Sequence, residues 1–357
     1  MRILHTGNPV SGYIMTRELR KRGIEADLLI EKFQIEGSFF SINNPLDHDK
    51  SLKEFPDWMK VQELKPGFRK LSIIKSMRKY DIIHAYQSEP VNAMLSGKPY
   101  VAQSVGDDLR KYAFRKSISG YLLRRAYQKA DQFVYVWPIL KPFVEKLGIK
   151  NALYLPRQWD AQHFSRETIK KSEEKTLRIF ISTVEWWALK GNDQFLRAFA
   201  RLCKEKKDVF LYYVDWGEDS SKARALLSSP EVREKVEIIP GPIAREKMAE
   251  YMEKSDILVE QFNSGSFTRM GIEAFSFGIP VLINLDEGLH KSLHGDCPPV
   301  INAKNEEEIY SKLKQFSNSK DSLYQMAVDA QKWVQKHFDL QKNVDRYIEI
   351  YENILRR

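Results

Sequence analysis

Cysteine is scarce in this sequence, with only Cys203 and Cys297 among 357 residues. Two cysteines form neither a disulfide framework nor a cysteine metal cluster. No apolar run approaches the ~18 residues that a membrane-spanning helix requires. The first residues also lack the basic, apolar and small-residue succession of a secretory signal. These absences predict a soluble protein of a reducing compartment, and we expect it in the cytoplasm.

The complete Gly-x-Gly-x-x-Gly run of dinucleotide-binding proteins is also missing after every expected strand. Its absence disfavours a nicotinamide oxidoreductase. The length exceeds one ordinary core, and at roughly 150 residues per domain it predicts two domains. Hydrophobic residues make up 43% of the chain and charged residues 29%, as in ordinary globular proteins.

Positive charge is in excess, because 57 basic residues outnumber 48 acidic ones and give a net charge of +9. Such an excess favours anionic partners. The densest stretch, 110–129, interleaves apolar side chains with Arg110, Lys111, Arg115, Lys116, Arg124, Arg125 and Lys129. One interpretation is a solvated helix face over a packed one, and another is a helix attracted to an anionic membrane surface. Nucleic-acid binding is a third, but no recognised module accompanies the charge, so we expect no nucleic-acid partner.

The first thirty residues indicate one βαβ unit. A strand is expected at 2–6, a loop at 7–12, a helix at 13–22 that Gly23 ends, and a strand at 26–30. This alternation implies a parallel sheet. The loop can present backbone N–H groups to a phosphate at a helix N-terminus, and a plain tight turn explains it equally well.

Two successive α/β series follow along the chain. Strands are expected at 81–84, 100–105, 132–136 and 153–156, and then at 177–182, 209–214, 236–239, 257–260 and 280–284. We predict an N-terminal domain over 1–165, a charged linker over 166–175, a C-terminal domain over 176–338 and a last helix over 339–357. Each domain is expected to be a doubly wound parallel sheet with ligands at the carboxyl ends of its strands.

The most informative segment is 262–280, where a polar loop turns into a helix. Amides at 266–268 would point out of the helix N-terminus toward an anion. Glu273 on the first turns of this helix can accept hydrogen bonds from the vicinal hydroxyls of a ribose. Gly278-Ile279-Pro280-Val281 then ends the helix and starts a buried strand. The alternative is an ordinary exposed glutamate before a helix stop.

This order of loop, Glu-Ala helix and Gly-x-Pro-Val strand resembles the donor site of family-4 retaining glycosyltransferases of the GT-B fold, in which two Rossmann-like domains face a central cleft. The resemblance implies that Glu273 holds the ribose of a nucleotide-sugar, and that Gly265, Ser266, Phe267 and Thr268 line the donor. Family members carry a second glutamate at the position of Gly265. This departure concerns how the donor sugar is handled.

A second match is Ser182-Thr183 at a strand end, followed by Lys190-Gly191 at the opening of a helix. The resemblance implies that Lys190 offsets the charge of the departing nucleoside diphosphate, either with Arg269 as a second cation or alone. Thr183 stands where the family has an arginine. The alternative for Lys190 is a solvated lysine before a glycine turn, and the tryptophans at 186 and 187 pack either on a sugar or on protein.

Matches in the first half are weaker and more scattered. Gly12 matches a loop glycine of the family, and Asp108 matches a Gly-x-Asp loop that orients itself or the acceptor. Val105 stands where many relatives carry a histidine, for which His84 is a substitute candidate with a structural role as its alternative. Ile243 follows a strand at the loop that commonly meets the nucleobase.

The resemblance thus implies a hexosyl-type glycosyltransferase that moves a sugar from a nucleotide-diphosphate-sugar to a hydroxyl acceptor. It implies retention of configuration, no metal and no cofactor besides this co-substrate, with Lys190, Arg269 and Asp108 as catalytic residues. The basic stretch favours a lipid-linked or polysaccharide acceptor and peripheral association with an anionic membrane, at its inner face. The alternatives are a non-catalytic nucleotide-sugar-binding protein, which Val105 and Gly265 favour, and a sugar-nucleotide epimerase of the same architecture.

Overall fold

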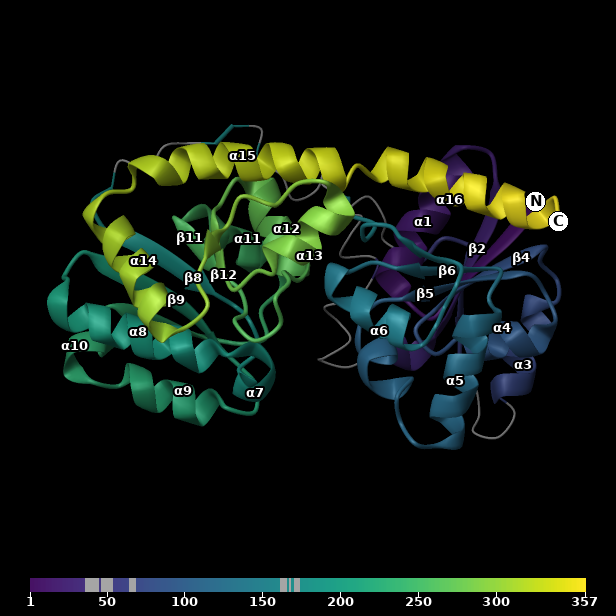
Figure 1. Ribbon diagram of the computed structural model, residues 1–357, viewed down its shortest axis with the longest axis horizontal. Helices are drawn as coiled ribbons and strands as arrows, with labels where there is room; N and C mark the ends of the chain where they lie inside the picture. The colour runs from purple at the N-terminus through teal and green to yellow at the C-terminus, as the bar shows by residue number, and fades with distance from the viewer. Residues whose placement is uncertain (36–44, 46–53, 64–68, 161–165, 167, 170–173) are drawn as a thin grey trace. The chain divides into compact units, whose positions relative to one another are not determined.

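The computed structural model describes residues 1–35, 45, 54–63, 69–160, 166, 168–169 and 174–357 (Figure 1). The chain divides into two compact units. The first comprises Met1–Asp160 and Phe338–Arg357, and the second comprises Ala161–His337. The end of the first expected domain, at 161–165, and residues 167 and 170–173 of the expected linker lie outside the described residues.

A seven-stranded parallel sheet forms the centre of the first unit, in the order β3-β2-β1-β4-β5-β6-β7. Its strands are β1 (Arg2–Thr6), β2 (Glu25–Glu31), β3 (Met59–Gln62), β4 (Ile82–Tyr86), β5 (Tyr100–Ser104), β6 (Gln132–Tyr135) and β7 (Ala152–Tyr154). The helices between them are α1 (Pro9–Lys21), α3 (Arg69–Met77), α4 (Pro90–Ser96), η3 (Asp108–Tyr112), α5 (Ile118–Lys129) and α6 (Lys141–Lys146). The strand order runs outward from β1 and β4, so the sheet is doubly wound.

Helix α1 begins at Pro9, earlier than the sequence indicates, so the loop predicted over 7–12 is wrong from residue 9 onward. The Asn8 side chain accepts the Ser11 amide at 2.9 Å, and Pro9 occupies the first helical position. Both features favour a helix start. Gly12 lies inside α1, where a Cβ atom would stand 2.5 Å from Cδ1 of Leu28 on β2. Glycine therefore allows α1 to approach the sheet closely.

The last helix, α16 (Leu340–Leu355), belongs to the first unit and lies along α1 in Figure 1. The Tyr351 hydroxyl lies 2.6 Å from Nδ1 of buried His84, and His84 Nε2 lies 2.9 Å from Oε1 of Gln103. Tyr347 donates to the same Gln103 oxygen at 2.8 Å. His84 therefore fixes α16 to strands β4 and β5, which is the structural role given above as its alternative.

The second unit contains a six-stranded parallel sheet in the order β10-β9-β8-β11-β12-β13. Its strands are β8 (Leu177–Ile181), β9 (Val209–Asp215), β10 (Val236–Pro240), β11 (Ile257–Val259), β12 (Val281–Ile283) and β13 (Ile301–Asn302). The helices are α7 (Trp187–Lys190), α8 (Asn192–Glu205), α9 (Ser220–Leu227), α10 (Pro230–Arg233), α11 (Arg245–Glu253), α12 (Arg269–Phe277), α13 (Glu287–His294), α14 (Glu306–Asn318) and α15 (Asp321–His337). The predicted class of two doubly wound parallel sheets is confirmed.

Acidification is expected to destabilise the first unit through His84. Burial lowers the pKa of His84 to about 3, against 6.5 for an ordinary histidine. Between pH 6.5 and pH 3 the unfolded chain therefore binds a proton that the folded chain does not, and stability falls as pH falls, by ~1.4 kcal/mol per pH unit. Urea unfolding followed by circular dichroism at pH 7.5, 6 and 5 should show a weaker pH dependence for His84→Gln than for the wild type. An identical dependence in the two proteins would contradict this role.

Candidate functional site

The candidate site lies in the second unit, at the carboxyl ends of β8 and β11. The strand order reverses between these two strands, and ligands of open α/β sheets bind outside the carboxyl ends of strands at such a reversal. Thr183 and Lys190 follow β8, and Gln261 follows β11. This edge of the sheet therefore carries several of the residues singled out from the sequence.

Lys190 and the loop at 265–268 are connected through Gln261. The Lys190 ammonium donates to Oε1 of Gln261 at 2.8 Å, and Nε2 of Gln261 donates to the carbonyl of Ser266 at 2.5 Å. The Phe262 amide donates to the carbonyl of Lys190 at 2.6 Å, which holds the α7 turn against the same loop. Lys190 is thus half-buried and oriented, rather than a freely solvated lysine.

The loop between β8 and α7 is held from inside by two buried polar side chains. Asn192 Nδ2 lies 3.4 Å from the carbonyl of Thr183 and 3.3 Å from Oε1 of Glu185. The Trp187 indole donates to Oε2 of Glu185 at 2.8 Å. Burial raises the pKa of Glu185 to about 7, so the group titrates near neutral pH. Trp187 therefore packs on protein, whereas Trp186 is 40% exposed.

Gly265 stands where the family resemblance leads one to expect a glutamate, and its backbone explains the exchange. Its φ is +70°, in the left-handed region that side-chain-bearing residues avoid. The Gly265 carbonyl accepts the Asp286 amide at 2.9 Å, which joins the loop to the start of α13. A glutamate at this position would therefore have to adopt the left-handed conformation or change the loop.

Glu260 is a site residue that the sequence reasoning missed. It is fully buried at the end of β11, and its Oε1 accepts the Thr268 amide at 2.9 Å, the Thr268 hydroxyl at 2.7 Å and the Gly271 amide at 2.8 Å. Its Oε2 is buried without a hydrogen-bond partner among the described residues. Burial raises the pKa of Glu260, and the nearby Lys190 charge opposes this rise.

These bonds correct the expectation that the Thr268 amide is free for a phosphate. The carboxylate of Glu260 already occupies the N-terminus of α12, because it accepts hydrogen bonds from the amides of Thr268 and Gly271. The Thr268 hydroxyl accepts the Met270 amide. Negative charge at a helix N-terminus is stabilising, which accounts for this arrangement.

Glu273 lies on α12 and is buried, not exposed as its alternative interpretation required. Arg245 Nη2 donates to Oε1 of Glu273 at 2.6 Å, and Nε of Arg269 lies 3.4 Å from the same oxygen. Arg245, the first residue of α11, is itself 7% exposed. The structure therefore brings Glu273 and Arg269 together and adds an arginine that sequence reasoning missed.

The other expected donor residues occupy different environments. Phe267 is 2% exposed and packs against the rings of His290 and Trp333, so it supports the loop from the core. Ser266 is 2% exposed. Ile243 is half-buried and follows the cis Gly241–Pro242 peptide bond at the turn from β10 into α11.

Asp108 and Gly12 lie in the first unit. Asp108 is buried, and its Oδ1 accepts the Gly106 amide at 2.8 Å while its Oδ2 accepts the Tyr127 hydroxyl at 2.6 Å. Burial raises the pKa of Asp108. These bonds fix the loop after β5, so Asp108 orients its own loop. The Gly12 amide donates to the Asn8 carbonyl at 2.9 Å inside α1.

A glutamate introduced at Gly265 is expected to destabilise the protein without distorting the rest of the site. Forcing a side chain into the left-handed region costs roughly 1–2 kcal/mol, which corresponds to a fall in Tm of a few degrees. Ser264→Glu is the matched control, because it adds the same charge at the preceding residue, whose φ is not positive. Thermal melting measures both variants, and equal melting temperatures would show that the backbone of Gly265 imposes no such cost.

One family model matches the unit that contains this site. Residues 161–333 match the family model of glycosyl transferases group 1. The matched span contains every element of the candidate site described above, from β8 to α13. No curated protein sequence matches the chain closely enough to establish a relationship.

Solved structures share the fold over nearly the whole chain. The HepE protein of Anabaena, in complex with UDP-glucose, is 12% identical and covers 99% of this chain and 100% of its own, with a TM-score of 0.72. Sucrose-phosphate synthase of Thermosynechococcus elongatus is 12% identical over 99% of both chains, with a TM-score of 0.69. A UDP-N-acetylglucosamine 2-epimerase assigned in Listeria monocytogenes is 14% identical and covers 98% of this chain and 94% of its own, with a TM-score of 0.61.

These similarities confirm the predicted GT-B architecture of two doubly wound domains. Fold similarity does not by itself separate transferases from epimerases. The family model that matches describes glycosyl transferases, and its match covers most of the unit that contains Lys190, Glu260 and Glu273. Over residues 161–333, the chain is similar to the glycosyl transferases group 1 family.

Proposed function

We propose that the protein transfers a hexosyl group from a nucleotide-diphosphate-sugar to a hydroxyl acceptor. The observation that carries the proposal is the arrangement of Glu273. This carboxylate is buried between Arg245 and Arg269 at the strand ends of the unit that matches the glycosyl transferases group 1 model. Both cations contact Oε1 of Glu273 and fix the orientation of its carboxyl group. We propose that this group accepts hydrogen bonds from the vicinal hydroxyls of a ribose.

The chemistry assigned to this site is a displacement at the anomeric carbon of the donor. The bond from that carbon to the β-phosphate oxygen breaks, and its electron pair leaves with the diphosphate. The acceptor oxygen forms the new bond, and its proton passes to the departing diphosphate. Lys190 and Arg269 would offset the charge of the departing diphosphate, which is the largest stabilisation such a site can supply. We propose that the reaction retains anomeric configuration and requires no metal, as the family resemblance implies.

The direct experiment is incubation with UDP-, GDP-, ADP- and TDP-hexoses in the presence and absence of hydroxyl acceptors. A transferase releases nucleoside diphosphate together with a glycosylated acceptor, and NMR of the product gives the anomer. A sugar nucleotide that changes its own stereochemistry without an acceptor would indicate an epimerase. Binding without diphosphate release would indicate a non-catalytic binding protein. An unchanged rate after treatment with EDTA is the expected result for metal independence.

Removal of the Lys190 charge should affect turnover more than binding. Lys190→Ala is expected to lower the transfer rate by ~10²–10³-fold, as the loss of one electrostatic stabiliser does in other enzymes. Lys204→Ala, at an exposed position in the last turn of α8, is the matched control and should retain the wild-type rate. A Lys190→Ala rate within a factor of three of the wild type would remove Lys190 from the catalytic residues.

Glu273→Gln should weaken nucleotide binding while preserving the shape of the site. Hydrogen bonds to a charged group contribute ~1.5–3 kcal/mol, so the Kd for UDP or the preferred nucleotide should rise about ten- to a hundredfold. The variant leaves buried Arg245 facing a neutral amide, so its melting temperature is measured alongside. Unchanged affinity in a folded variant by isothermal titration would show that Glu273 does not hold the donor.

We further propose that the acceptor is lipid-linked or a polysaccharide at an anionic membrane. The supporting surface consists of exposed residues of η3 and α5 and of the loop between them: Lys111, Tyr112, Arg115, Lys116, Ile118, Tyr121, Arg125 and Lys129. Ile118 is 80% exposed and Tyr121 is 54% exposed, while Leu123, Ala126 and Tyr127 of α5 are buried. Residues 109–130 contain no acidic side chain. None of the described helices is long and apolar enough to cross a membrane.

Vesicle flotation tests this surface. Vesicles containing phosphatidylglycerol should carry the protein, and phosphatidylcholine vesicles should not. Each basic residue near an anionic surface contributes about 1 kcal/mol, so reversing two charges in Arg115→Glu/Lys116→Glu should lower partitioning by more than tenfold. Lys204→Glu/Lys332→Glu changes the net charge equally at exposed positions of the second unit and is the control. Equal failure to bind both kinds of vesicle would contradict the proposal.

A further inference from the structure

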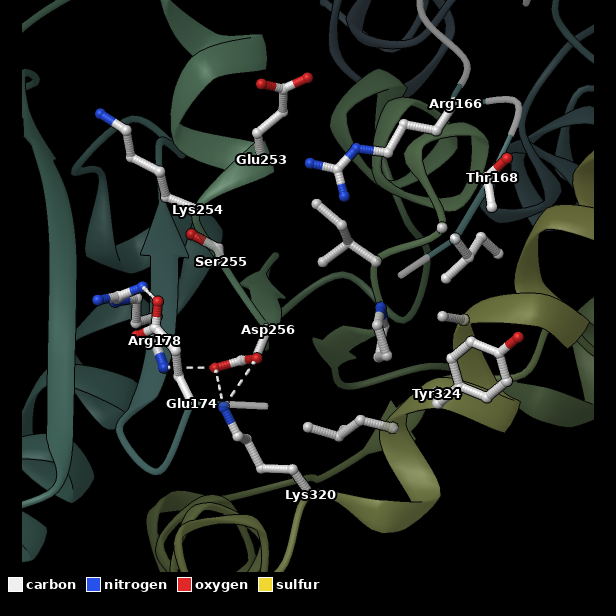
Figure 2. A pocket seen from close by; sticks show the side chains of 16 residues that line it. Arg166, Thr168, Glu174, Arg178, Glu253, Lys254, Ser255, Asp256, Lys320 and Tyr324 are labelled. Carbon is white, nitrogen blue, oxygen red and sulfur yellow. Dashed lines mark hydrogen bonds and ion pairs between the residues drawn. The ribbon is translucent and has the colours of Figure 1, made fainter. Parts of the chain in front are cut away.

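A cavity of about 680 Å³ opens in the second unit, at the amino ends of the strands (Figure 2). Asp256 and Pro280 line it directly before β11 and β12, and Arg178 lines it at the start of β8. The candidate donor site lies at the carboxyl ends of these same parallel strands. The two sites therefore lie at opposite edges of one sheet, and this cavity is no part of the donor site.

Most charges at the bottom of the cavity are already neutralised. The Lys320 ammonium lies 3.1 Å from each carboxylate oxygen of Asp256, and the Arg178 amide donates to Oδ2 of Asp256 at 2.8 Å. The Arg178 guanidinium donates to Glu174 at 2.5 Å. Figure 2 shows this network along one wall. These groups hold the wall together and leave little net charge for a ligand.

Arg166 is different, because its guanidinium has no hydrogen bond or ion pair within the described parts of the chain. Its backbone is held on both sides: its amide donates to the Ser276 carbonyl at 3.4 Å, and its carbonyl accepts Nε2 of Gln331 at 2.9 Å. The guanidinium carbon lies 5.9 Å from the centre of the Phe277 ring, and Figure 2 shows the side chain extending into the cavity. The fixed backbone thus presents a positive charge that no described carboxylate neutralises.

The cavity also has an apolar wall, formed by Ile169, Gly278, Ile279, Pro280, Leu323 and Ala327. Ile169 packs closely on Gly278: a Cβ atom on residue 278 would lie 2.5 Å from Cγ1 of Ile169. The Tyr324 ring is 41% exposed at the same opening. Glu253 and Lys254 also line the cavity, at exposed positions at the end of α11. A cavity of this size, with an apolar wall beside polar and charged groups, has the character of a small-molecule site.

We propose that this cavity is a second ligand site, separate from the donor site, for a small amphipathic anion. The ligand would be an aromatic or aliphatic ring that bears one phosphate or carboxylate group. The ring packs on the apolar wall and Tyr324, and the anionic group pairs with Arg166. Arginine suits such a partner because its planar fork binds phosphate and carboxylate with two hydrogen bonds.

Isothermal titration of the full chain with phenyl phosphate tests the proposal, with phenol and inorganic phosphate as the two half-ligands. Phenyl phosphate should bind more tightly than either half. Arg166→Gln should weaken its binding roughly tenfold, as expected for a charge-assisted contact. Ala327→Phe, which fills the cavity, should abolish binding, and its melting temperature shows whether it folds. Lys332→Gln, at an exposed position of α15, is the matched control and should leave binding unchanged.

Saturating UDP-glucose separates this site from the donor site. The proposal requires phenyl phosphate to bind with the same affinity in its presence, and this result does not depend on whether the protein transfers sugars. Displacement by UDP-glucose would place the probe in the donor site and overturn the proposal. No binding at millimolar probe, or unchanged affinity in Arg166→Gln, would overturn it as well.

Discussion

The candidate site depends on one buried interaction, between the carboxylate of Glu260 and the first turn of α12. Glu260 ends a core strand, and one of its oxygens accepts two amides and a hydroxyl from Thr268 and Gly271. A carboxylate in the interior costs free energy unless hydrogen bonds and a nearby cation compensate it. Because Lys190 supplies the nearby positive charge, the strand end, the helix start and the lysine form one electrostatic unit.

This unit determines where the other site residues stand. With the start of α12 fixed to β11, Arg269 and Glu273 are set on the first turns of a helix that cannot shift along the sheet. Gln261, next to Glu260, connects Lys190 to the carbonyl of Ser266. Arg245 contacts Glu273 from the start of α11. The connections β8–α7, β10–α11 and β11–α12 therefore each contribute a charged residue to the site. The far end of α12 stops at Gly278, with φ +69°, and forms part of the second cavity.

The sequence predicted the architecture well, because buried parallel strands appear as short apolar runs between helices. It missed β3 and β13, which are short: β3 carries exposed side chains, and β13 has two residues. The last helix, expected over 339–357, is observed at Leu340–Leu355. The expected start of α1 at residue 13 is too late, because Asn8 and Pro9 were assigned to a loop. The Asn8 cap and the proline at the first helical position are the sequence signals that indicate a helix start at residue 9.

The site was predicted in part. Lys190 is recognisable before Gly191, and Glu273 is recognisable before Ala274 on a helix that leads into Gly278-Ile279-Pro280-Val281. In the structure Lys190 follows β8 and Glu273 lies on α12, which follows β11. Glu260 and Arg245 were not visible as site residues, because a charge at a strand end or a helix start becomes informative only when its partner in space is known. For the same reason the sequence could not show that the Thr268 amide was already taken.

Hydrogen exchange of the wild-type chain with and without UDP-glucose tests the central claim most directly, namely that the carboxyl ends of β8 and β11 receive the donor nucleotide. The account predicts slower exchange of amides in residues 183–191 and 260–273 when the nucleotide-sugar is present. Unchanged exchange in both segments at saturating ligand, or protection confined to the cavity at the opposite edge of the sheet, would contradict it.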